Sequence, residues 1–224
     1  MIKAVIFDMD GVIVDTEPLH HKAYRLMFKD VNIDVSDSLY ESFTGQSTYN
    51  ICNRLCEHFK LPLCPQTLVD IKRDHFNFLF ENDKDLKLIE GVLELIKDYH
   101  QNGMTLVLAS SASMPNIDKI FKRFDLDAYF KTKMSGADLK ASKPHPEIFI
   151  NAAKATGYKN SRCLVIEDST NGIKAAKAAD LFCVGFKSPN SKNQDYSEAD
   201  LVIDNFNTIR SENLRKLFNN ASVH

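Results

Sequence analysis

The chain has 224 residues, and 28 Lys and Arg against 30 Asp and Glu give a formal net charge of −2. This balance excludes a broad basic surface, and with it non-specific nucleic-acid binding, because phosphate contacts need clustered basic side chains. Hydrophobic residues make up 44% of the chain and charged residues 26%, which is typical of a folded globular protein, and no apolar run approaches the roughly 20 residues of a membrane span.

Short apolar runs rich in β-branched residues recur along the chain and predict buried strands. They cover residues 4–7, 106–109, 164–166, 182–186 and 201–203. Continuous apolar runs of this kind are typical of strands that are covered on both faces, as in a parallel sheet. Helical patterns lie between them, at residues 117–124, 148–156 and 173–179. The alternation predicts a doubly wound α/β fold whose strands end at one common edge, where such folds bind ligands.

One stretch near the start of the chain interrupts this alternation. Between residues 17 and 85 no strand pattern is found, and helices are predicted at residues 19–28, 50–59 and 66–80. A helical block of this length is too large for a single crossover, and it therefore predicts a separate lid or cap. We expect an α/β core formed by residues 1–16 and 86–224 and an inserted cap formed by residues 17–85.

The five cysteines do not form a disulfide framework, because their number is odd and their spacing is irregular. Cys163 and Cys183 lie in apolar runs and are expected to be small core residues. Cys52 and Cys56 are four residues apart on a predicted helix, but no second pair completes a metal site. This cysteine usage, together with the absence of a predicted secretory signal at the start, indicates a reducing, cytoplasmic location.

Chemically active side chains gather where the predicted strands end. They are Asp8, Asp10 and Gly11 after the first strand, Ser110 and Ser111 after the second, Lys143 in a loop, and Glu167 and Asp168 after residues 164–166. Four carboxylates repel one another at short range, so they coexist when some are protonated or when a cation lies among them. Oxygen ligands of this kind suit Mg²⁺. Because Lys143 and the hydroxyls suit an anion beside the metal, the pattern predicts a phosphate-handling site.

Each residue of this group has an expected role. Asp8 can attack phosphorus and form an aspartyl phosphate, and Asp10 can protonate the leaving oxygen and then activate water. Gly11 allows a tight turn and a close approach to the phosphate.

The remaining residues are expected to bind the anion and the metal. Ser110 and the N–H group of Ser111 can hold phosphoryl oxygens, and Lys143 offsets their charge. Asp168, together with Glu167, is expected to hold the metal. Taken singly, these residues also fit turns and helix N-caps; their joint placement at strand ends favours the functional interpretation.

The motifs resemble those of the haloacid dehalogenase superfamily. The resemblance rests on residues 7–12 with 15–18, 108–111, 142–146, and 166–169 with 171–172. The helical block is similar to the four-helix cap of the β-phosphoglucomutase and sugar-phosphate phosphatase branch. Asp10 argues against the dehalogenase branch, which lacks an acid at this position.

This resemblance implies a specific distribution of roles. Asp8 is the implied nucleophile and Asp10 the implied acid and base, while Ser110 and Lys143 bind the phosphate. The implied ligands of Mg²⁺ are the side chain of Asp8, the main-chain oxygen of Asp10, Glu167 and Asp168.

Two enzyme activities remain open for such a chain, a phosphatase and a phosphohexomutase. Mutase-like members carry a cap arginine that grips a second phosphate; here Thr48 takes that place, and the nearest arginine is Arg54. This absence favours hydrolysis, although Lys72 or Arg73 could supply the charge. His20 matches a histidine of the mutase pattern and favours the other activity, unless it only packs within its helix.

We therefore expect a Mg²⁺-dependent phosphatase that acts on a small, sugar-like phosphomonoester, with a β-phosphoglucomutase-type mutase as the alternative. His20, Gly45 and Gln46 are the cap residues expected to contact the substrate. A catalytically dead phosphate-binding regulator is a further alternative, but such a protein is expected to lack Asp8, Asp10 or Lys143, and none is missing. The expected partner is a phosphorylated metabolite, without nucleic acid or membrane; the sequence does not define the oligomeric state and is compatible with a monomer.

Overall fold

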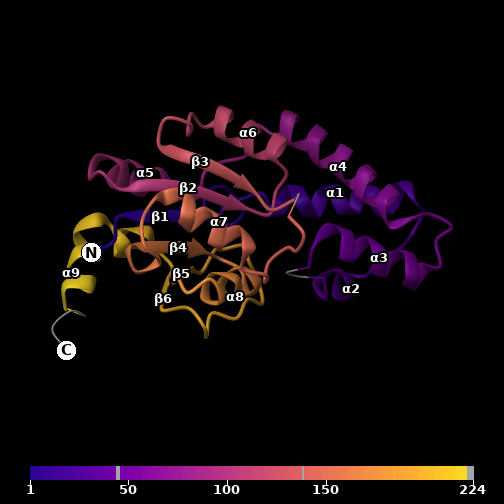
Figure 1. Cartoon of the computed structure of the whole chain (residues 1–224). Coiled ribbons are helices and arrows are strands. Elements are labelled where there is room, and N and C mark those ends of the chain that lie inside the picture. Colours follow the sequence, from indigo (N-terminus) through magenta and orange to yellow (C-terminus); the bar gives the residue numbers. More distant parts are fainter. Residues whose placement is uncertain (44–45, 138, 221–224) are drawn as a thin grey trace. The chain divides into compact units, whose positions relative to one another are not determined.

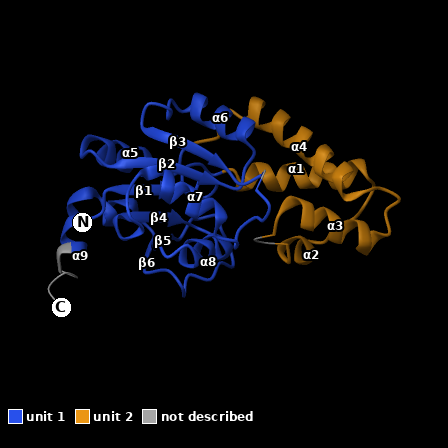
Figure 2. Cartoon of the chain, in the orientation of Figure 1, with its two compact units in different colours: residues 1–15, 88–224 blue, residues 16–87 orange. Residues whose placement is uncertain are grey.

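A computed structural model describes residues 1–43, 46–137 and 139–220 of the chain. The chain divides into two compact units (Figure 2). Unit 1 comprises Met1–Asp15 and Leu88–His224, and unit 2 comprises Thr16–Lys87. The two units are described separately below.

Unit 1 is built on a six-stranded parallel sheet with the order β3-β2-β1-β4-β5-β6 (Figure 1). The strands are β1 (Ala4–Phe7), β2 (Thr105–Ser110), β3 (Phe130–Ser135), β4 (Cys163–Glu167), β5 (Phe182–Phe186) and β6 (Leu201–Ile203). The parallel sheet confirms the predicted α/β fold class. Strands β2 and β3 are added on one side of β1, and strands β4 to β6 on the other side. Ligands of doubly wound sheets bind where the order changes sides in this way.

The helices of unit 1 precede or follow these strands along the chain. They are α5 (Val92–Gln101), α6 (Met114–Arg123), α7 (Glu147–Thr156), α8 (Thr170–Ala178) and α9 (Ser211–Asn220), with short 3₁₀ turns at Asn160–Arg162 and Phe206–Ile209. One hydrophobic core joins α7 and α8 to the sheet, and Phe149 and Ile173 are fully buried in it. Small residues such as Ala175 and Ala176 let α8 approach the strands closely.

The strand β3 was not predicted from the sequence. Its residues Lys131 and Lys133 interrupt any apolar run, because β3 is an edge strand and is only partly buried. Lys133 forms ion pairs with Asp118 at 2.7 Å and Asp127 at 2.6 Å. Charged side chains on an edge strand oppose pairing with other chains, which accounts for the polar pattern.

Unit 2 contains the helices α1 (Glu17–Asp30), α2 (Asp37–Glu41), α3 (Thr48–Phe59) and α4 (Pro65–Asn82). Three of them match the predicted helices. The unpredicted α2 is only five residues long and begins where the hydroxyl oxygen of Ser36 accepts a hydrogen bond from the N–H group of Leu39. Unit 2 has its own core, to which Met27, Leu55 and Leu68 belong. The five cysteines are free thiols, and no helix in the described part of the chain is both long and apolar enough to cross a membrane.

The core of unit 1 provides a test of this packing. Ile173 is fully buried, so the substitution Ile173→Ala is expected to lower the free energy of unfolding by about 2–5 kcal/mol, through lost burial and the cavity it leaves. The neighbouring Lys174 is exposed, and Lys174→Ala is expected to change this free energy by less than about 0.5 kcal/mol. Urea unfolding followed by circular dichroism measures both values, and equal effects of the two substitutions would contradict the packing described.

Candidate active site

Asp8 is the first residue after β1, the strand that lies between β2 and β4. Its N–H group donates a hydrogen bond to the carbonyl of Ile166 at 3.0 Å, which extends the parallel pairing with β4 by one residue. The Asp8 side chain is only 8% exposed. The sheet therefore fixes this carboxylate at the carboxyl edge, beside the end of β4.

The ammonium group of Lys143 lies between two of the carboxylates. Its Nζ donates hydrogen bonds to Asp8 Oδ1 at 2.5 Å, to Glu167 Oε1 at 2.7 Å and, more weakly, to the carbonyl of Ala109 at 3.3 Å. It also lies 4.7 Å from the centre of the Phe149 ring. Burial opposes the charge of Lys143, but attraction and hydrogen bonds from Asp8 and Glu167 outweigh it and raise its pKa.

Glu167 ends β4, and Asp168 follows it. Glu167 Oε2 accepts hydrogen bonds from the N–H group of Ser169 at 2.7 Å and from its hydroxyl at 2.9 Å. Ser169 is also the N-cap of α8, since its hydroxyl oxygen accepts a hydrogen bond from the N–H group of Gly172. The start of α8 therefore fixes the orientation of Glu167.

Two glycines make room for these carboxylates. Gly11 has φ of +84°, and a Cβ atom there would lie 2.0 Å from Asp168 Oδ2. A Cβ atom on Gly172 would lie 1.7 Å from Glu167 Oε1. Any side chain at either position would displace a carboxylate. The close approach that the structure shows at Gly11 is to Asp168, and the expected approach of Gly11 to the phosphate stays a prediction.

The buried carboxylates of Asp8, Glu167 and Asp168 each offer an oxygen within 4.8 Å of the others. Burial, together with repulsion from Glu167 and Asp10, raises the pKa of Asp8 to about 7, although Lys143 opposes the rise. Burial and the charges of Glu167 and Asp8 also raise the pKa of Asp168 well above its usual range. Three carboxylates against one ammonium leave negative charge that is not compensated within the cluster.

This donor set fits a divalent cation. Hard carboxylate oxygens suit Mg²⁺, and a cation among them would favour their ionised forms and lower their pKa values. Both oxygens of Glu167 already accept hydrogen bonds from the protein, whereas Asp8 and Asp168 each accept one from a side chain, Lys143 and Ser191 respectively. The contribution expected of the Asp10 main-chain oxygen stays a prediction.

The other predicted core residues lie at the same edge. Ser110 ends β2 and is fully buried, and its hydroxyl oxygen accepts a hydrogen bond from the N–H group of Ala112 at 3.0 Å. Ser111 follows and is exposed. Asp10 is partly buried and close enough to influence the pKa of Asp8. The structure thus places all the predicted core residues where β1, β2 and β4 end, while their catalytic roles stay predictions.

The predicted cap residues belong to unit 2. His20 lies on α1, where its Nδ1 is 2.7 Å from the Nζ of Lys72 and its ring stacks on Phe76 at 4.4 Å. Burial and the charge of Lys72 lower the pKa of His20 well below its usual value, which favours the neutral imidazole. Gln46 precedes α3, and Gly45 lies outside the described residues. Substrate contacts of these three residues stay predictions.

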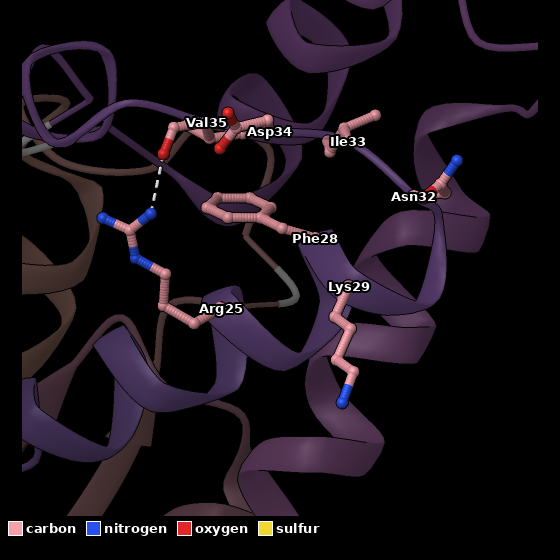
Figure 3. A pocket seen from close by; sticks show the side chains of 7 residues that line it. All are labelled: Arg25, Phe28, Lys29, Asn32, Ile33, Asp34 and Val35. Carbon is pink, nitrogen blue, oxygen red and sulfur yellow. Dashed lines mark hydrogen bonds between the residues drawn. The ribbon is translucent and has the colours of Figure 1, made fainter.

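Unit 2 also has a pocket of about 410 Å³ at the end of α1, lined by Arg25, Phe28, Lys29 and residues 32–35 (Figure 3). The guanidinium of Arg25 is already engaged there, because it donates hydrogen bonds to the carbonyl of Val35 and to Asp37. The pocket contains none of the predicted site residues.

Two side-chain contacts could not be predicted from the sequence. The first is the contact of Lys72 with His20, which joins α1 to α4 and has no local motif. The second is the hydrogen bond that the hydroxyl of Ser191 donates to Asp168 Oδ2. A polar segment directly after the strand at residues 182–186 was the available signal, since that strand ends at the same sheet edge.

The raised pKa of Asp8 predicts a measurable pH dependence in the metal-free protein. Its carboxyl has a pKa of about 7 when folded and an ordinary one when unfolded, so wild-type stability due to Asp8 decreases as the pH rises from about 4 to 7. Asp8→Asn removes this titration. The variant is expected to gain stability relative to wild type over that range, by at most about 1.4 kcal/mol per pH unit. Urea unfolding in EDTA measures the difference; a difference that is independent of pH would contradict the prediction.

Proteins of known sequence resemble this chain over most of its length. Residues 5–186 match the haloacid dehalogenase-like hydrolase family. CbbY from Cereibacter sphaeroides is 28% identical over 215 residues, which cover 92% of this chain and 93% of that protein. A phosphorylated carbohydrates phosphatase from Thermotoga maritima is 31% identical over 188 residues, which cover 80% of this chain and 82% of the relative.

Solved structures are also similar to this chain over most of its length. A β-phosphoglucomutase from Clostridium difficile is 28% identical, with a TM-score of 0.81 and 100% coverage of both chains. A mutant of CbbY from Rhodobacter sphaeroides, in complex with xylulose-1,5-bisphosphate, is 27% identical with a TM-score of 0.82, and the match covers 92% of this chain and 95% of the other. Because the family match spans most of the chain and includes Asp8, Asp10, Lys143 and Asp168, this chain belongs to the haloacid dehalogenase-like hydrolases.

Proposed function

We propose that the protein is a Mg²⁺-dependent phosphatase that hydrolyses a small, sugar-like phosphomonoester through an aspartyl-phosphate intermediate. The observation that carries this proposal is the Asp8 carboxylate, buried at the carboxyl end of β1, 2.5 Å from Lys143 Nζ and clustered with Glu167 and Asp168. The phosphatases among the relatives support it, including the one from Thermotoga maritima that is named for phosphorylated carbohydrates.

In the first step, a carboxylate oxygen of Asp8 attacks phosphorus and displaces the alkoxide of the substrate. The bond to the leaving oxygen breaks as the acyl phosphate forms. The carboxyl group of Asp10 gives its proton to that oxygen, and the alcohol departs. The ammonium of Lys143 offsets the negative charge of the phosphoryl group and of Asp8.

In the second step, water attacks phosphorus and the acyl phosphate bond breaks, which returns the electron pair to Asp8. The carboxylate of Asp10 accepts a proton from this water and is ready for the next substrate. The hydroxyl of Ser110 and the N–H group of Ser111 are proposed to bind phosphoryl oxygens during both steps.

A bound cation would favour this chemistry, because Asp8 must be ionised to attack, whereas burial, with repulsion from Glu167 and Asp10, raises its pKa to about 7 in spite of Lys143. The proposed ligands of Mg²⁺ are the Asp8 and Asp168 carboxylates and the main-chain oxygen of Asp10, with Glu167 beside them. Bound Mg²⁺ supplies positive charge that favours the ionised carboxylate and binds phosphoryl oxygens.

A mutase is the second candidate, because one specific feature of unit 2 favours it. The ammonium of Lys72 is buried beside His20, and a cation in a cap is what binding of a second phosphate requires. The similarity to β-phosphoglucomutase structures supports the same candidate. Arg54 differs from Lys72 because it is exposed on α3, with its guanidinium 5.0 Å from the centre of the Phe43 ring.

The phosphatase proposal predicts phosphate release from a panel of sugar phosphates in the presence of Mg²⁺ and its loss in EDTA. Asp8→Asn is expected to lower kcat at least 1000-fold, on the order of the losses that follow removal of a covalent nucleophile. Lys174→Ala is the matched control and is expected to keep full activity. Absence of phosphate release over the whole panel, or an active Asp8→Asn variant, would exclude the proposed mechanism.

A second measurement separates the two candidate activities. The protein is supplied with β-glucose 1-phosphate and a bisphosphate primer, and both inorganic phosphate and glucose 6-phosphate are measured. A phosphatase is expected to give little glucose 6-phosphate, because water rather than a second sugar takes the phosphoryl group. Efficient conversion to glucose 6-phosphate would establish the mutase instead.

A further inference from the structure

The connection between β5 and β6 in unit 1 (Figure 1) contacts Asp168 of the carboxylate cluster. Residues 188–196 of this connection are called the 188–196 loop. The hydroxyl of Ser191 donates a hydrogen bond to Asp168 Oδ2. The hydroxyl of Tyr196 donates a second bond, at 3.0 Å, to the main-chain oxygen of Asp168. Both the side chain and the backbone of Asp168 are therefore held by this loop.

The 188–196 loop is itself anchored after Ser191. Gln194 Oε1 accepts hydrogen bonds from the N–H group of Thr170 at 2.8 Å and from its hydroxyl at 3.0 Å. The N–H group of Asp195 donates to the Thr170 hydroxyl at 2.8 Å. Since Thr170 begins α8 only two residues after Asp168, these bonds fix the loop to the same turn that carries the carboxylate.

Further anchors lie on either side. The side-chain amide of Asn190 donates a hydrogen bond to Asp15 Oδ2 at 2.5 Å. The ring of Tyr196 packs on β5, where a Cβ atom on Gly185 would lie 2.9 Å from its Cδ1. With anchors before and after it, the main chain at Ser191 is held at points that do not involve the bond of its hydroxyl to Asp168.

The two oxygens of Asp168 have different surroundings. Oδ2 accepts the hydrogen bond from the Ser191 hydroxyl and is the nearer oxygen to Gly11, where a Cβ atom would lie 2.0 Å from Oδ2 and 3.0 Å from Oδ1. Within the described residues, no hydrogen bond to Oδ1 is found. One oxygen is therefore fixed by the protein, and the other remains to serve as a ligand, which is the arrangement that hydrogen bonds around metal sites usually produce.

We propose that Ser191 is a positioning residue that orients the Asp168 carboxylate for cation binding. This inference rests on the proposed Mg²⁺ site. It adds a second serine to that site, because Ser169 orients Glu167 from α8 while Ser191 orients Asp168 from the 188–196 loop. Neighbouring acids at the end of β4 are thus held by separate elements of the fold.

The test uses the full-length protein and three substitutions. Ser191→Ala removes the hydroxyl, Ser191→Thr keeps it, and Ser197→Ala changes an exposed serine next to the loop that contacts no site residue in the described structure. Mg²⁺ is titrated against the thermal unfolding midpoint, which gives the half-saturating Mg²⁺ concentration without any substrate. Urea unfolding in EDTA checks that each variant folds, and the Mg²⁺ dependence of phosphate release is measured in parallel.

Ser191→Ala is expected to raise the half-saturating Mg²⁺ concentration about 10- to 100-fold, the usual effect of losing a partner of a metal ligand. Stability in EDTA and kcat at saturating Mg²⁺ should change little, Ser191→Thr should restore wild-type affinity, and Ser197→Ala should match wild type. An unchanged or tighter Mg²⁺ affinity in Ser191→Ala, or a loss that Ser191→Thr does not restore, would overturn the inference alone. A wild-type protein that neither responds to Mg²⁺ nor hydrolyses the panel would instead refute the proposed function, and the inference with it.

Discussion

Lys143 is a buried ammonium between two buried carboxylates, and the arrangement of the sheet edge depends on this contact. Asp8 and Glu167 come from neighbouring strands whose parallel pairing brings their ends together, so their charges would repel each other without a cation between them. Lys143 offsets part of this repulsion, but the pKa of Asp8 stays raised, at about 7. Burial of the Asp168 carboxyl beside them adds a further cost in folding free energy. A divalent cation bound at this cluster would stabilise the folded protein.

Other elements of unit 1 hold the buried carboxylates in place. Bare backbone at Gly11 and Gly172 gives the carboxylates room, and the N-cap of α8 orients Glu167. On the other side, the 188–196 loop donates to Asp168. Each acid is therefore held by a different element of the fold, and the cluster keeps its geometry while its charge remains available to a cation and a phosphoryl group.

The fold class and the core site could be predicted because they depend on local signals. Buried strands are continuous apolar runs, and the carboxyl ends of parallel strands meet at one edge, so Asp8, Ser110 and Glu167 could be placed together from the sequence. The edge strand β3 escaped prediction because it is only partly buried, and Lys131 and Lys133 interrupt its apolar pattern. The contacts of Ser191 with Asp168 and of Lys72 with His20 escaped because they join residues 23 and 52 positions apart, respectively, with no motif between them.

The covalent role of Asp8 is the central claim, and trapping the intermediate tests it most directly. The protein is quenched with borohydride while it turns over a sugar phosphate in Mg²⁺, and the peptide that contains Asp8 is analysed by mass spectrometry. Borohydride reduces an acyl phosphate to an alcohol, so homoserine is expected at position 8, only when substrate is present, while Asp10 stays intact. Homoserine at position 10, or an unmodified Asp8 in protein trapped during a phosphate burst, would contradict the assignment of Asp8 as the nucleophile.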